Sequence, residues 1–223
     1  MELSIDTASE LASLALSQEG ELRAEVSWLC RRNQTAELLP TLERLLAQMG
    51  ASKRDLTAVF VSLGPGMYTG LRVGISVAQG LAFALKLPAA GVGRLELDAL
   101  AYAASDRPIL PVHTAGRGEL AWAVYEAVDG GVRELRAPGL SLPETMLAEA
   151  PANALFCGEV KPDLAEMIRE KLPQARIAAP PASGRAALLA RAGYRRLLRE
   201  GARAPGLLRP IYLREAVADT KSG

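Results

Sequence analysis

The sequence contains few of the residues from which many enzymes and secreted proteins build their sites. Its 223 residues include one histidine, two cysteines and only 4% aromatic residues. The single histidine, His113, excludes any site that needs a pair of histidines, such as the zinc centre of a metalloprotease. Cys30 and Cys157 cannot form a disulfide framework in a chain of this size, so we expect two reduced thiols. The start Met-Glu-Leu-Ser has no apolar leader, which indicates a cytoplasmic protein.

Long hydrophobic runs are missing as well. The longest apolar stretch, residues 71–87, is interrupted by Arg72, Gln79 and Lys86, so it is too polar to span a membrane. Hydrophobic residues make up 49% of the chain and charged residues 23%, which is typical of a globular protein. With so few aromatic residues, the core must be aliphatic. The length allows one large domain or two small ones.

The net charge of +1 hides an uneven distribution. Residues 1–160 carry 13 basic and 19 acidic side chains, whereas residues 161–223 carry 13 and 6. The basic residues include a helical run made of Arg185, Arg191, Arg195, Arg196, Arg199 and Arg203. Such a face could meet a nucleic acid or an acidic partner. The pattern favours a solvated helix instead, because Tyr194 is the only ring available to stack on a base.

Hydrophobic periodicity in the first half predicts strands followed by helices. Apolar side chains alternate through residues 1–28 and predict a three-stranded antiparallel meander. In the next helix the apolar residues include Leu38, Leu42, Leu45 and Met49, and Pro40 indicates that this helix begins near residue 40 or bends there. Further elements are predicted in the order strand 56–63, a Gly-Pro-Gly turn, helix 69–87, strand 89–92 and helix 95–104.

The second half repeats this order. Strands are predicted at 109–112, 120–127, 132–136, 155–157 and 176–178, and helices at 143–149, 162–172 and 183–201. The polar segment 105–108 reads as a linker, so we predict a first domain over 1–106 and a smaller, degenerate second domain over 107–223. Mixed sheets flanked by helices make this an α/β protein.

Two segments have the composition of a phosphate site. Asp6 and Thr7 follow the first strand and offer a carboxylate and a hydroxyl at a turn, as a metal-bound phosphate requires. Gly64 and Gly66 lie between a buried strand and a helix, where glycines let a ligand approach the backbone. Both segments also fit ordinary turns, with Gly66 supplying an unusual backbone conformation. If Asp6 is only a turn residue, Asp6→Asn should change stability by about 1 kcal/mol or less.

The helix after the glycine turn has a row of small residues at Gly70, Gly74 and Ala78, beside a row of large ones that includes Val77 and Leu81. Small residues let another helix come close. A helix apolar on most sides is buried on most sides, so its second face should meet another subunit or the preceding helix. Nucleophilic catalysis has no support, because His113 is the only imidazole and fits a structural role.

Several segments resemble the TsaB (YeaZ) family. They are Leu-Ser-Ile-Asp-Thr-Ala-Ser at the start, Leu38-Leu39-Pro40, Gly-Pro-Gly-Met-Tyr-Thr-Gly-Leu-Arg-Val-Gly over 64–74, Ala-Gln-Gly-Leu-Ala over 78–82 and Pro-Ile-Tyr-Leu-Arg over 210–214. The resemblance is dense over residues 1–104 and thin after them. It implies an actin/Hsp70/sugar-kinase-like fold with two RNase H-like halves. It also implies the dimerisation subunit of the bacterial complex that places N6-threonylcarbamoyl on adenosine 37 of ANN-decoding tRNAs.

The resemblance further implies that this chain has no catalytic residues, metal or cofactor of its own. The catalytic paralogue, TsaD, holds a metal through a His-x-x-x-His pair at the start of the first helix, whereas residues 32–38 contain no histidine. The family's Asp-Ala-Arg before the second hairpin is replaced by Thr114-Ala115-Gly116-Arg117. ATP and metal are therefore expected only in partner subunits. The implied partners are a TsaD-type catalytic subunit, a TsaE-type ATPase, tRNA through the complex, and a second copy of the chain when it is alone.

We expect the two apolar helices to pack side by side and to form the partner interface. The predicted interface residues are Leu38, Leu42, Leu45, Met49, Gly70, Gly74, Val77, Ala78 and Leu81. Asp6, Thr7, Gly64 and Gly66 are interpreted as remnants of a phosphate loop. The alternative function is a stand-alone ATPase or kinase of the same superfamily, which nucleotide binding by the chain alone would reveal.

Overall fold

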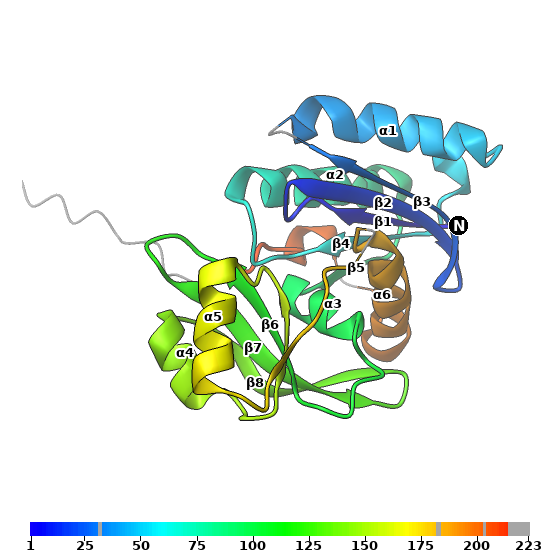
Figure 1. Ribbon diagram of the computed structural model, residues 1–223. Helices are drawn as coiled ribbons and strands as arrows, with labels where there is room; N and C mark the ends of the chain where they lie inside the picture. Colours follow the sequence, from blue (N-terminus) through cyan, green and yellow to red (C-terminus); the bar gives the residue numbers. More distant parts are fainter. Residues whose placement is uncertain (31–32, 182–183, 203, 214–223) are drawn as a thin grey trace, which may run out of the picture.

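The computed structural model describes residues 1–30, 33–181, 184–202 and 204–213, and its elements form two β-sheets with helices on both faces of each (Figure 1). The first sheet contains β1 (Glu2–Asp6), β2 (Leu11–Gln18), β3 (Glu21–Leu29), β4 (Ala58–Ser62) and β5 (Ala89–Val92). The second contains β6 (Ile109–Thr114), β7 (Leu120–Val128), β8 (Gly131–Ser141), β9 (Leu155–Gly158) and β10 (Arg176–Ile177). The helices are α1 (Gln34–Gln48), α2 (Tyr68–Leu85), α3 (Arg94–Leu100), α4 (Pro143–Glu149), α5 (Pro162–Lys171) and α6 (Ala186–Glu200), with two 3-10 turns, η1 (Lys53–Asp55) and η2 (Pro205–Leu207).

The two sheets have the same topology. Their strand orders are β3-β2-β1-β4-β5 and β8-β7-β6-β9-β10. In each, the first strand pairs antiparallel with the second and parallel with the fourth, so a meander is followed by two parallel strands. This confirms the predicted repeat, and the fold is of the actin/Hsp70/sugar-kinase type with two RNase H-like halves.

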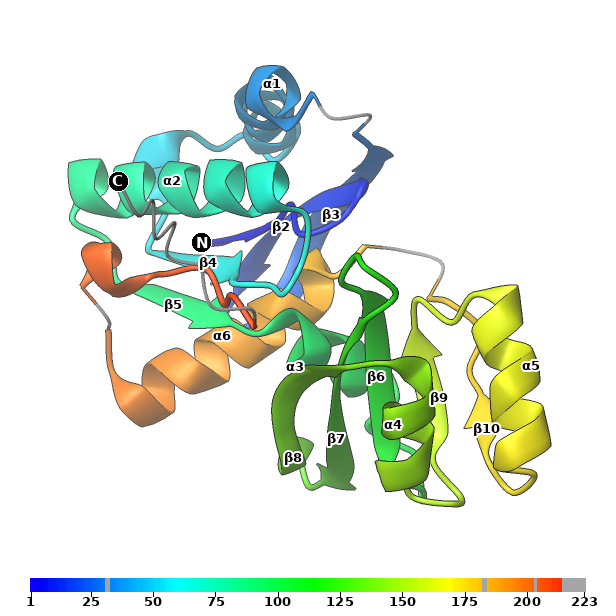
Figure 2. The same cartoon turned by 90° about the vertical axis from the view of Figure 1, so that its left-hand side faces the viewer.

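Each sheet is packed between layers of helices, as Figure 2 shows. The helices α1 and α2 lie side by side on one face of the first sheet, with Leu42 and Ile75 in the shared core. The helix α6 covers the other face, where Leu189 meets Phe60. On the second sheet, α4 and α5 cover one face and α3 the other. Successive side chains of a strand point to opposite faces of its sheet, so each sheet contributes residues to two cores, one on each face.

The C-terminal part of the chain does not stay with the second sheet. After β10 the chain returns to the first sheet through α6 (Figure 1). The segment after it is held there by Ile211 N–H, which donates to Leu63 O (2.8 Å), and by the Gln79 side chain, which donates to Leu208 O (3.0 Å). The predicted domain 107–223 is wrong in this respect. We call the first sheet with α1, α2, α6 and residues 204–213 the N-lobe, and the second sheet with α3, α4 and α5 the C-lobe.

The helix α1 begins at Gln34, six residues before Pro40, so of the two predicted alternatives, a start near residue 40 or a bend there, the first is wrong. Proline in a helix removes the bond to the carbonyl four residues earlier, here that of Ala36. Both residues are exposed, so water can hydrate the free carbonyl, and the helix continues. The predicted helix start at Ser183 lies outside the described residues, and α6 begins at Ala186. Within the described residues, no helix combines the length and the hydropathy needed to cross a bilayer.

Candidate functional site

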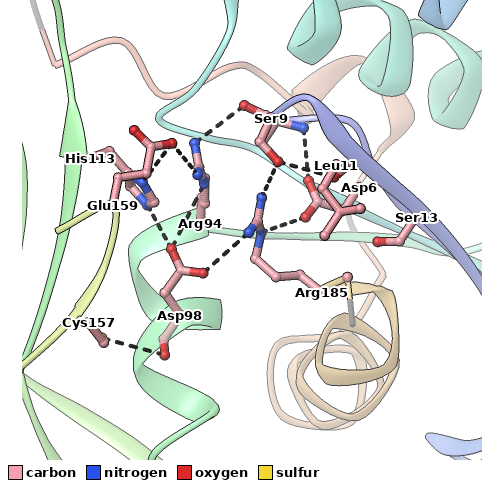
Figure 3. A network of polar contacts seen from close by, with 12 residues as sticks. Asp6, Ser9, Leu11, Ser13, Arg94, Asp98, His113, Cys157, Glu159 and Arg185 are labelled. Carbon is pink, nitrogen blue, oxygen red and sulfur yellow. Dashed lines mark hydrogen bonds and ion pairs between the residues drawn. The ribbon is translucent and has the colours of Figure 1, made fainter. Parts of the chain in front are cut away.

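A cluster of charged side chains lies between the two lobes, and all of them except Glu159 are buried (Figure 3). It is formed by Asp6 at the end of β1, Arg94 and Asp98 in α3, His113 in β6, Glu159 after β9 and Arg185 before α6. The six residues come from five segments that are far apart in the chain, so no single motif could encode the cluster. Charged groups are costly to bury unless they are paired, and here they are paired with one another.

The N-lobe fixes Arg185 through the backbone that surrounds it. The N–H groups of Gly184 and Ala186 donate to the hydroxyls of Ser27 (3.0 Å) and Ser13 (3.1 Å), which lie on β3 and β2. A Cβ at Gly184 would lie 2.4 Å from the Cβ of Ser13, so only glycine lets the chain approach the sheet this closely. These contacts satisfy free amides at the start of α6 and hold the Arg185 side chain toward β1.

Arg185 connects two buried carboxylates. Its Nε donates to Asp6 Oδ2 (2.7 Å) and its Nη2 donates to the Ser9 hydroxyl (2.7 Å). Its Nη1 lies 3.5 Å from Asp98 Oδ1. The side chains of Asp6, Asp98 and Arg185 are 0%, 6% and 10% exposed. The other Asp6 oxygen accepts the Ala8 N–H (2.8 Å), so both oxygens of this carboxylate have partners within the chain.

The C-lobe side of the cluster is centred on Glu159. This carboxylate accepts a hydrogen bond from Arg94 Nη2 (2.8 Å) and another from the Thr114 hydroxyl (2.8 Å). His113 lies between two carboxylates, with Nε2 2.7 Å from Asp98 Oδ2 and Nδ1 3.5 Å from Glu159 Oε1. Burial alone would raise the pKa of Asp98, but His113 and the two arginines lower that pKa to about 2. Burial also opposes ionisation of Glu159, and His113 and Arg94 nevertheless hold its pKa well below the usual value.

The four residues predicted as remnants of a phosphate loop lie in two turns that pack against each other, and the contacts of Thr7 and Gly66 are made within the chain. The Thr7 hydroxyl donates to Gly70 O (2.7 Å). A Cβ at Gly66 would lie 2.2 Å from Ala8 O, so the glycine turn rests directly on the turn after β1. Gly64, not Gly66, has the positive φ angle (91°), and the prediction for Gly66 is corrected accordingly.

The cavity beside this contact is small. It has a volume of about 170 Å³ and is lined by Pro65, Gly66, His113, Thr114 and Tyr212 among others. Sites for small molecules and cofactors usually enclose about 300–1,000 Å³. Among the described residues, no group of three or more His, Cys, Asp or Glu side chains is placed to hold a metal ion. The residues present therefore do not fit a nucleotide at this position.

Two expectations about single residues are wrong. Asp6 is not an ordinary turn residue, because its carboxylate is fully buried in an ion pair. Arg185 is not part of a solvated basic face, because it is the partner in that pair. The remainder of the basic run is mixed: Arg196 is bound by Glu96 (2.8 Å), whereas Arg191 and Arg195 are exposed. Arg203 lies outside the described residues.

Most of the predicted interface residues lie in the core of the N-lobe. The buried ones are Leu38, Leu42, Leu45, Gly70, Gly74 and Ala78. A Cβ at Gly70 would lie 2.2 Å from Thr7 O, and one at Gly74 would lie 2.3 Å from the Thr7 hydroxyl. The small-residue row thus lets α2 approach the end of β1, and the prediction that it contacts another helix or subunit is corrected.

The exposed face of α2 carries a large apolar side chain, Phe83, near its C-terminal end. Phe83 is 81% exposed, although large apolar side chains are usually covered. Gly80 and Ala84 of the same helix are also exposed, and Val77 and Leu81 of this helix are half-buried. Of the predicted interface residues, Met49, Val77 and Leu81 therefore keep exposed area, and Phe83 is a residue that sequence reasoning missed.

Sequence reasoning also missed Arg94, Asp98 and Glu159. A signal was present for the first two, because they are charges of opposite sign at positions i and i+4 of the same helix. Charged residues at such positions are either solvated or paired in the interior. Nothing in the sequence around Glu159 indicates its partner, which lies 65 residues away.

Comparison with known proteins places the chain in a family. The family described as "TsaD: tRNA N6-adenosine threonylcarbamoyltransferase" matches residues 28–221. The tRNA threonylcarbamoyladenosine biosynthesis protein TsaB of Escherichia coli (strain K12) is 37% identical over 132 residues, which is 58% of this chain and 57% of that protein. The TsaB protein of Bacillus subtilis (strain 168) is 32% identical over 128 residues, or 57% and 56% of the two chains. The matched region thus spans little more than half the length of these relatives.

Solved structures are similar to this chain over a longer region than the sequence matches cover. The structure described as "YeaZ from Pseudomonas aeruginosa" superimposes with a TM-score of 0.79 at 28% identity, covering 95% of this chain and 99% of that one. The repeated topology, the glycine turn packed on β1 and these likenesses all agree. The chain therefore belongs to the family described as TsaD, tRNA N6-adenosine threonylcarbamoyltransferase, and within it to the TsaB (YeaZ) group.

Proposed function

We propose that this chain is a non-catalytic scaffold subunit that binds and activates a TsaD-type catalytic subunit. The complex would transfer threonylcarbamoyl to adenosine 37 of ANN-decoding tRNAs. The curated relatives are named for threonylcarbamoyladenosine biosynthesis, and the family description names the transferase. The observation that carries the proposal is the pairing of Asp6 with Arg185 at the place where a phosphate site would lie.

That pairing argues against the alternative, a stand-alone ATPase or kinase. Phosphoryl transfer needs a carboxylate that is free to hold a metal ion, and room for the phosphates. Here both Asp6 oxygens are bonded within the chain, and the glycine turn contacts Ala8. The purified chain should bind MgATP no more tightly than its Asp6→Ala variant. Saturable ATP binding or turnover that disappears in this variant would favour the ATPase.

The outer face of α2 supports a role in assembly. Interfaces between subunits have an apolar centre with aromatic anchors, and a partner would cover Phe83 together with the borders formed by Val77 and Leu81. The nearby Gly80 and Ala84 would let a partner helix approach. Because the catalytic subunit has the same fold, its own first two helices would meet this face in an approximately two-fold arrangement. A second copy of the chain would use the same face when the catalytic subunit is absent.

The remaining components follow from the family. ATP and metal would be held by the TsaD-type subunit and by a TsaE-type ATPase, and tRNA would be bound through the complex. The chain would work in the cytoplasm, where its two buried cysteines stay reduced.

Co-purification with a TsaD-type subunit tests the proposal. Phe83→Glu should abolish co-purification, because an unpaired charge in an interface costs several kcal/mol. Leu135→Glu is the matched control, since Leu135 is 53% exposed on β8 of the other lobe and should leave binding unchanged. If Phe83→Glu folds and co-purifies at parental stoichiometry, the proposed face is wrong. If the parent protein does not bind, the scaffold role is wrong.

A further inference from the structure

The charged cluster also connects the two lobes. Two of its contacts cross from one lobe to the other. Arg185, anchored on the N-lobe, lies 3.5 Å from Asp98 of the C-lobe helix α3. Arg94 of the same helix donates to Ala8 O (3.4 Å) in the turn after β1. Figure 3 shows these side chains as one continuous chain of contacts from Asp6 to Glu159.

Arg185 supplies one of only two guanidinium groups in this cluster. Asp6, Asp98 and Glu159 supply three carboxylates, and Arg94 and Arg185 supply two guanidinium groups. Arg94 is turned toward Glu159, with Nη2 at 2.8 Å, and its Nε is 3.9 Å from Asp98. Asp6 therefore depends on Arg185 for its ion pair, whereas Asp98 lies near Arg94 and His113 as well as Arg185.

We infer that Arg185 is a built-in cation that fixes the orientation of the two lobes, so that the chain holds its closed form without any ligand. In a two-lobed protein of this fold, an open orientation would separate Arg185 from Asp98 and fill the space with water. The guanidinium keeps the two carboxylates paired while they are buried, which favours the closed orientation. Arg185 acts here as a positioning residue and has no role in chemistry.

Removal of Arg185 has a specific structural consequence. Asp6 and Asp98 would remain buried with no cation between them, and two such carboxylates repel each other. Water can relieve this by entering between the lobes, where it is opposed by the packing of Leu97 of α3 in one apolar cluster with Phe60 and Leu189. The ion pair between Arg196 of α6 and Glu96 of α3 also holds the lobes together. The lobes of Arg185→Ala should nevertheless open, while the core of each lobe stays folded.

The distance between spin labels on the two lobes measures this opening in the isolated chain, so the result does not depend on any partner. Labels are placed on cysteines introduced at Gln48 in the N-lobe and Glu170 in the C-lobe, both of which are exposed. The native Cys30 and Cys157 are buried and remain unlabelled in the folded chain. The parent should give one narrow distance distribution, unchanged by MgATP.

Arg185→Ala should shift this distribution to longer distances and broaden it. Arg191→Ala is the matched control, because it removes an exposed arginine from α6, the helix that follows Arg185, and should change nothing. Adding methylguanidinium to Arg185→Ala should restore the narrow distribution, and sodium at equal concentration should not. A folded Arg185→Ala with the parental distribution would overturn the inference.

A second variant keeps the inference falsifiable if Arg185→Ala does not fold. Asp98→Asn preserves the volume of the side chain and removes the charge that Arg185 meets across the lobes. It should broaden the distribution in the same direction as Arg185→Ala, to a smaller extent. An unchanged distribution in this variant would also show that the cluster does not set the orientation of the lobes.

Discussion

Two Gly→Ala substitutions on the same helix should change stability in opposite directions. Gly74 and Gly80 both lie inside α2, and alanine is favoured over glycine in a helix by about 1 kcal/mol. At Gly80 nothing lies within 4 Å of an added Cβ, so Gly80→Ala should stabilise the chain by up to about 1 kcal/mol. At Gly74 the added Cβ would lie 2.3 Å from the Thr7 hydroxyl, which is already bonded to Gly70 O.

The cost at Gly74 comes from that contact. The Thr7 hydroxyl would have to rotate and leave a buried carbonyl without its donor, or α2 would have to move away from β1. Overpacking of this kind costs about 1–3 kcal/mol, so the two alanine variants should differ in unfolding free energy by about that amount. With a urea dependence of about 2 kcal/mol/M, their unfolding midpoints should differ by about 0.5–1.5 M.

Urea unfolding followed by circular dichroism measures the difference. In a Thr7→Ala background the hydroxyl is absent, so Gly74→Ala should lose most of its penalty. Equal midpoints for Gly74→Ala and Gly80→Ala would refute the packing of the small-residue row on β1. The row would then be free to face a partner, as the sequence alone suggested.

Three further predictions concern the cluster and the C-terminal segment. Asp6→Asn should destabilise the chain by up to about 3–5 kcal/mol, because the buried Arg185 loses the closer of its two carboxylate partners. Thermal unfolding measures this, with the exposed Asp129→Asn as the control. The pKa of Asp98 is lowered to about 2 on folding, so the contribution of this carboxylate to stability is complete above about pH 4 and is lost as the pH falls toward 2. Because His113 helps to lower this pKa, His113→Gln should unfold at a higher pH than the parent in an acid titration followed by circular dichroism. Tyr212→Ala removes the stacking of Tyr212 on Tyr68, whose ring centroids are 5.7 Å apart, and should weaken the attachment of the C-terminal segment by about 0.5–1.5 kcal/mol. Proteolysis of this segment should then be faster, and an unchanged cleavage rate would contradict the contact.

The elements that depend on local pattern were predictable. Alternating side chains gave the meander of β1, β2 and β3, and the glycine turn was placed correctly between β4 and α2. The repeat of this order in the second half then predicted the doubled fold. These features depend on neighbouring residues and on a period of two or 3.6, which a single sequence carries.

The site itself was not predictable, because its contacts join residues far apart in the chain. Asp6 and Arg185 are 179 positions apart, and each resembles an ordinary surface residue in its local sequence. The small residues Gly70 and Gly74 were visible, but the sequence could not tell a neighbouring strand end from a partner helix. The return of α6 to the first sheet had no local signal either, since an amphipathic helix does not encode which sheet it covers.

If the chain activates a catalytic subunit and performs no chemistry itself, tRNA modification should need both proteins. Transfer of threonylcarbamoyl to an ANN-decoding tRNA can be measured as this chain is titrated into a fixed amount of TsaD-type subunit with the TsaE-type ATPase present. We expect little transfer without the chain, a rise that saturates near equimolar addition, and no rise with Phe83→Glu. Full transfer in the absence of the chain, or transfer by the chain without the catalytic subunit, would show that the chain does not have this role.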